Sequence, residues 1–194
     1  MGFFSKLFSA RRTVFRAMEE QENRLRALSA LPDGELTEQE DETLCEVLAF
    51  RIDQAVNAHF GEPHKRRMTL ADCYAAFSDA RRGWAIADLF ASIMDSEVEG
   101  LYVVLEPNEL GRYVWELPGI LRTLGADAHA DLLEAFFRKN GIDPTDMDAF
   151  WARDPAEQPF ERFNRSFRAL PPLSSLLAAY GRLHLSLWQE AAFR

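Results

Sequence analysis

Residues 84–95, which read WAIADLFASIMD, decide the fold class of this chain. Their apolar side chains return every three or four positions, the spacing that places them on one face of an α-helix. These side chains are Ile86, Leu89, Phe90, Ile93 and Met94, and Val98 continues the row. We therefore expect a helix that buries one face in a hydrophobic core.

The same spacing recurs on both sides of this segment and predicts an all-α chain. A Thr-x-x-Glu pattern at Thr37 and a Thr-x-x-Asp pattern at Thr69 are typical of helix starts, and Gly141 is placed to end a helix in a left-handed conformation. The helices expected are 37–60, 69–82, 84–98, one from Pro118, 127–140 and one after Pro172. The sequence predicts a single-domain multi-helix bundle with short loops over 33–194, preceded by an amphipathic helix in 1–32.

Residues 101–105, LYVVL, are the one segment where β-branched and aromatic side chains favour a strand. The segment lies between Gly100 and Pro107 and is too short for periodicity to decide. We favour a kinked helical continuation over a strand.

Composition predicts a folded cytoplasmic protein. Of the 194 residues 47% are hydrophobic, with 15 Phe and 4 Trp, and no uninterrupted apolar run reaches the roughly 20 residues that span a bilayer. The N-terminus lacks the continuous apolar region of a secretion signal. Cys45 and Cys73 are expected to be free buried thiols in a reducing compartment.

Acidic residues dominate the charge and are unevenly placed. The formal net charge is −9, and residues 31–60 carry eight acidic residues against one arginine. Such a region repels phosphates, so we expect no direct nucleic-acid binding and expect either a basic protein partner or a role in solubility. The candidate surface here consists of Glu35, Glu38, Asp41, Glu42 and Glu46.

A second group of acids lies along the helix expected from Trp84 onward. Asp88, Asp95 and Glu99 share one stripe with Ser92. Carboxylates in such a row could raise one another's pKa for acid–base or metal-assisted catalysis, but a solvated face or an interaction surface explains the same spacing. No nucleophile, phosphate-binding or metal-ligand motif is present, so we expect neither an enzyme nor a cofactor or metal.

The segment from Asp95 to about Asn140 resembles the bacterial DNA-mimic protein family. The positions that carry the resemblance are Glu97, Gly100, Tyr102, Asn108 and Gly111. Glu99, Leu101 and Val104 stand where family members carry Asn, Gly and Gln. The resemblance implies an acidic helical domain whose surface competes with DNA for a basic protein.

The helix in 1–32 allows one further reading. Its basic residues Lys6, Arg11, Arg12 and Arg16 alternate with apolar ones, a pattern that suits an anionic membrane surface. Glu19, Glu20 and Glu22 interrupt the positive face. We therefore favour docking on the core of the chain and do not expect membrane contact.

Overall fold

The computed structural model describes residues 3–96, 100–107, 110–153 and 160–188, with the backbone alone for 3–15 and 187. Eleven α-helices occupy these ranges and no strand does, so the predicted all-α multi-helix fold is confirmed. The helices are α1 (Phe3–Ser29), α2 (Asp33–Thr37), α3 (Asp41–Phe60), α4 (Leu70–Tyr74), α5 (Asp79–Asp95), α6 (Leu101–Val104), α7 (Leu117–Thr123), α8 (Asp127–Asn140), α9 (Met147–Trp151), α10 (Phe160–Arg168) and α11 (Leu173–Leu183), with short 3-10 helices at Pro63–Lys65 and Leu185–Trp188.

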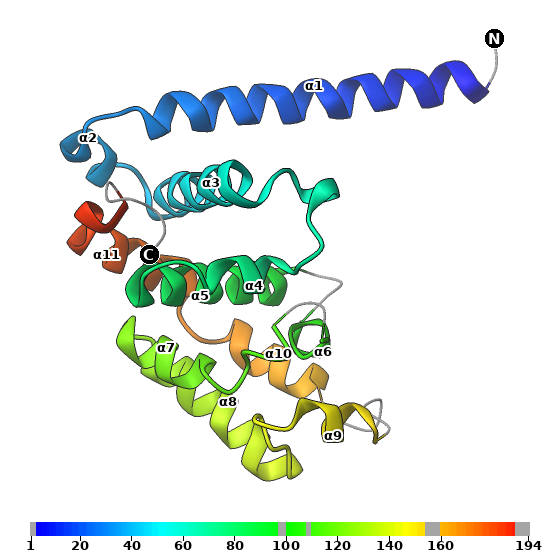
Figure 1. The fold of residues 1–194 in the computed structure, drawn as a ribbon, viewed down its shortest axis with the longest axis vertical. Coiled ribbons are helices and arrows are strands. Elements are labelled where there is room, and N and C mark those ends of the chain that lie inside the picture. The colour runs from blue at the N-terminus through cyan, green and yellow to red at the C-terminus, as the bar shows by residue number, and fades with distance from the viewer. Residues whose placement is uncertain (1–2, 97–99, 108–109, 154–159, 189–194) are drawn as a thin grey trace.

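Helix α5 is the centre of the fold. It packs against α3, α4, α6, α7, α10 and α11, and Figure 1 shows it between α1 and α3 at one end of the molecule and α8 and α9 at the other. Trp84, Ile86, Phe90 and Met94 are fully buried, and burying an Ile, Phe or Met side chain contributes roughly 1.5 to 3 kcal/mol. The indole N–H of Trp84 donates to the Leu177 carbonyl at 3.0 Å, which ties α5 to α11.

Helix α1 lies across α3 (Figure 1). Leu25 and Leu28 near its C-terminal end pack against the core. Arg51 of α3 donates to the Ser29 carbonyl at 2.7 Å, at the last residue of α1. None of the helices in the described ranges combines the length and hydropathy needed to cross a bilayer.

Aromatic rings join α10 to its neighbours. Phe167 lies edge-on to Phe90 of α5, with ring centroids 5.3 Å apart, and Phe163 lies edge-on to Phe136 of α8 at 5.2 Å. Such pairs add about 0.5 to 1.5 kcal/mol beyond burial. The chain after residue 160 therefore closes the core between α5 and α8.

The two Thr-led start patterns have different outcomes. Thr69 and Asp72 form the predicted capping box, each side chain accepting a hydrogen bond from the other residue's backbone N–H. The box predicted at Thr37 is wrong, because Thr37 is the last residue of α2, where its hydroxyl donates to the Gly34 carbonyl, and is not the residue before α3. Helix α3 starts instead after Glu40, without a side-chain cap.

Predictions of helix limits have mixed outcomes. The limits predicted at 69–82 and 84–98 are wrong, because α4 ends at Tyr74 and α5 spans Asp79–Asp95. Phe77 lies in the intervening turn and is buried there, with its ring stacked on that of Tyr74. The helical reading of 101–105 is confirmed by α6, and Gly141 ends α8 in the left-handed conformation, with φ of 61°.

Candidate interaction surface

Four exposed glutamates surround the link between α2 and α3. They are Glu35, Glu38, Glu40 and Glu42, and we call them the acidic corner. Within the described part of the chain none of the four forms an ion pair. Asp41 and Asp33 lie in the same stretch, but Asp41 is paired with Arg182 and Asp33 interacts with Arg51, so the excess negative charge comes from the four glutamates.

Arg182 of α11 holds the acidic corner in place. Its Nε donates to the Thr37 carbonyl at 3.0 Å, its Nη2 to the Gln39 carbonyl at 2.7 Å, and its Nη1 to Asp41 Oδ1 at 2.6 Å. A planar guanidinium presents its donors in a fixed fork, so three bonds to one short link restrain its backbone. The hydrogen bonds from Arg182 and, second, from Ser175 keep the pKa of Asp41 below its usual value.

The five acids predicted for this surface therefore divide into two groups. Glu35, Glu38 and Glu42 are exposed. Asp41 is paired with Arg182, and Glu46 accepts from Arg24 of α1 at 3.1 Å and from Gln21 at 3.4 Å. Asp41 and Glu46 hold α11 and α1 against α3, whereas the exposed members remain accessible to a partner.

The predicted stripe on α5 does not form a convergent site. Asp88 and Asp95 are seven residues apart, which corresponds to about 10 Å along a helix. Asp95 and Ser92 are exposed, while Asp88 is partly buried. Burial, followed by the charge of Asp53, raises the pKa of Asp88 to about 7. Glu99 lies outside the described residues, and within those residues no group of three or more His, Cys, Asp or Glu is arranged to hold a metal ion.

Three of the five motif positions that suggested a family, Gly100, Tyr102 and Gly111, lie in described residues and pack around α6. Gly100 has φ of 134°, and a Cβ there would collide with the amide of Asn164, whose Oδ1 accepts from the Leu101 N–H at 3.0 Å. A Cβ at Gly111 would lie 2.7 Å from the Leu105 carbonyl oxygen. Both positions therefore require glycine.

The Tyr102 ring packs edge-on to Trp151 at 5.3 Å and to Phe160 at 5.5 Å. Its position thus joins α6 to α9 and α10. The remaining two motif positions, Glu97 and Asn108, lie outside the described residues.

No family model, curated protein or solved structure matches this chain. The resemblance to the DNA-mimic family therefore stays a prediction that depends on the motif residues. The described motif positions have structural roles at α6, away from the link that Arg182 holds.

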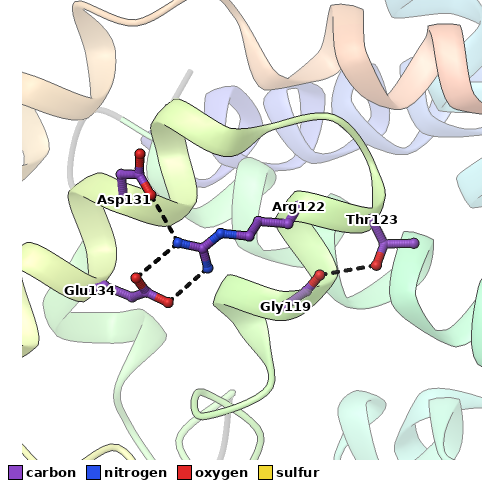
Figure 2. Close-up of polar contacts among 5 residues, drawn as sticks. All are labelled: Gly119, Arg122, Thr123, Asp131 and Glu134. Atoms are coloured by element: carbon purple, nitrogen blue, oxygen red, sulfur yellow. Dashed lines mark hydrogen bonds and ion pairs between the residues drawn. The ribbon is translucent and has the colours of Figure 1, made fainter.

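Other acids are neutralised within the fold. Figure 2 shows Arg122 of α7 reaching α8, where it contacts Glu134 at 2.7 and 2.8 Å and Asp131 at 2.8 Å. These hydrogen bonds keep the pKa of Glu134 below its usual value. Figure 2 also shows Thr123 donating to the Gly119 carbonyl at 3.1 Å within α7. The negative charge of α8 is thus partly balanced, unlike that of the acidic corner.

The sequence did not predict an open groove along α5, α7 and α11. Its volume is about 610 Å³, and its lining includes Arg82, Trp115, Glu116 and Tyr180. Trp115 is 53% exposed, which is unusual for so large an apolar side chain. The one hint in the sequence is the pair Gly83 and Gly119, small residues on facing helices that line the groove.

Proposed function

We propose that this protein is a non-enzymatic interaction module that presents its acidic corner to a basic partner protein. The observation that carries the proposal is the three-bond contact of Arg182 with residues 37–41. That contact fixes the backbone between exposed carboxylates on both of its sides. A rigid surface loses less conformational entropy when a partner binds, so its charges contribute more to affinity.

The charge pattern supports a protein partner. Carboxylates held on a fixed backbone attract Lys and Arg side chains and accelerate encounter with a positively charged surface. DNA-binding proteins carry such surfaces, and the resemblance to the DNA-mimic family makes competition with DNA the specific form of the proposal. The formal net charge of −9 also favours a positively charged partner.

The test compares two variants with the same change in net charge. The corner variant carries Glu35→Gln, Glu38→Gln, Glu40→Gln and Glu42→Gln. The control carries four exposed acids elsewhere neutralised, Glu19→Gln, Asp127→Asn, Asp148→Asn and Glu161→Gln. Immobilised wild-type and variant proteins are incubated with native lysate at low salt, and the retained proteins are identified by mass spectrometry.

We expect wild type and control to retain the same basic protein, to release it as salt rises, and to lose it to added duplex DNA. The corner variant should lose it at low salt. Equal retention by all three proteins would refute the role of the corner. If added duplex DNA does not displace the retained protein, competition with DNA is refuted, and only the proposal of an interaction module stands.

Arg182→Lys tests the role of the rigid link separately. Lysine keeps the positive charge but cannot make the three directed contacts. We expect partner affinity to fall several-fold while the exposed charges stay the same. Unchanged affinity would show that charge density alone explains binding.

A further inference from the structure

The groove beside α7 has the size and lining of a small-molecule site. At about 610 Å³ it falls within the range of ligand pockets, roughly 300 to 1,000 Å³. Its apolar lining comes from Trp115, Ile120 and Leu124, with Tyr180 contributed by α11. The exposed Trp115 ring offers a flat surface on which another ring can stack.

One polar pair lies in this apolar lining. Arg82 Nη2 contacts the two carboxylate oxygens of Glu116 at 2.6 and 2.7 Å, and the two side chains are only 20% and 17% exposed. The guanidinium also lies over the Tyr113 ring, 5.5 Å from its centroid. Contacts with both Glu116 and Tyr113 fix the orientation of Arg82.

The pair places hydrogen-bond donors next to acceptors. Arginine has five N–H donors and no acceptor, and a carboxylate has two acceptor oxygens and no donor. A ligand that contacts both therefore needs an acceptor adjacent to a donor. A flat ring with that edge could stack on Trp115 as well, because ring stacking tolerates many ring types.

We propose that this groove binds a flat heterocycle whose edge carries an acceptor beside a donor, as a purine base does. Guanine has a carbonyl acceptor for Arg82 next to two N–H donors for Glu116. Among the described residues of the lining, the charged ones are Asp79, Arg82 and Glu116, and the only cation of the three is paired with Glu116. The groove therefore disfavours phosphate groups, and the proposed ligand is a free base or nucleoside. The groove and the acidic corner share no lining residue, so either proposal can fail alone.

Gly119 provides a variant that blocks the groove without removing any side chain. An added Cβ there meets no atom within 4 Å, and leucine favours a helix more than glycine does. Gly119→Leu should therefore fold normally and fill the groove. Gly34 of α2 likewise has free space for a Cβ and lies outside the groove lining, so Gly34→Leu is the matched control.

The experiment titrates guanosine into the 194-residue protein and follows tryptophan fluorescence and NMR chemical shifts. Wild type and Gly34→Leu should bind one guanosine saturably, with Trp115 responding, and Gly119→Leu should bind at least tenfold more weakly. Inosine, which lacks one donor, and guanosine monophosphate should both bind more weakly than guanosine.

The proposal is wrong if guanosine does not bind saturably, if it binds equally well to Gly119→Leu, or if naphthalene, which has neither donor nor acceptor, binds as well as guanosine. Tighter binding of the monophosphate than of guanosine would also overturn it, because it would identify a phosphate site.

Discussion

Replacing Asp88 with asparagine should stabilise the protein at alkaline pH. Burial and the charge of Asp53 raise the pKa of Asp88 from 3.8 to about 7 in the folded state. The folded state therefore holds the Asp88 proton more tightly than the unfolded state does. The resulting stabilisation is fully present below pH 3.8 and is lost as pH rises through 7.

The magnitude follows from the difference between the two pKa values. One pKa unit corresponds to 1.36 kcal/mol, so the change between acid and alkaline pH is about 4 kcal/mol. Solvent screening at the partly exposed carboxylate lowers the expected gain to about 2 to 4 kcal/mol. Asp88→Asn should match wild type near pH 4 and exceed its free energy of unfolding by this amount at pH 8.

Urea denaturation followed by circular dichroism at pH 4, 6 and 8 measures the difference. Asp148→Asn, at an exposed position of α9, controls for the amide substitution. A difference between Asp88→Asn and wild type that does not change with pH would refute the reasoning, as would lower stability of the variant at pH 8.

Three further predictions use urea or thermal unfolding and thiol labelling. Burial lowers the pKa of His129, so the free energy of unfolding of wild type should fall by up to about 1.4 kcal/mol per pH unit below pH 6.5. Thermal melts between pH 7.5 and 5 should show a smaller fall in His129→Leu, and an identical pH dependence would contradict this prediction. Gly100→Ala should lower the free energy of unfolding, measured in urea, by about 1 to 3 kcal/mol, because alanine is strained at φ of 134° and its Cβ collides with Asn164. An unchanged free energy of unfolding would contradict this backbone conformation at Gly100. Burial raises the pKa of the Cys45 thiol to about 12, so in a Cys73→Ala background it should react with a disulfide reagent at pH 8 only as fast as the chain unfolds. Fast labelling of the native protein would show instead that the thiol is accessible.

Local sequence patterns predicted the helices better than their limits. The row from Ile86 to Met94 correctly predicted a helix, since burial of one helix face requires that spacing, but α5 begins at Asp79 and not at Trp84. The patterns at Thr37 and Thr69 look alike in sequence, yet only Thr69 forms a capping box. The difference arises because Thr69 directly precedes α4, whereas Thr37 is the last residue of a short helix, α2, that the sequence pattern did not predict.

The sequence predicted which residues give the candidate surface its negative charge, but not how other helices hold that surface. Acidic composition identified Glu35, Glu38 and Glu42, because exposed carboxylates need no partner. It could not reveal that Asp41 pairs with Arg182, since the two are 141 positions apart and lie in separate helices. The groove beside Trp115 was invisible for the same reason, because its walls come from α5, α7 and α11.

The contact of Arg182 with residues 37–41 has a consequence for synthesis of the chain. A ribosome makes residues 37–41 well before Arg182, which lies 141 positions after Asp41, so the acidic segment leaves the ribosome before Arg182 can bind it. Until α11 is complete, the like charges of the acidic segment repel one another on an unrestrained backbone. Proteolytic loss of α11 from the finished protein would return the segment to that state, with every glutamate still present.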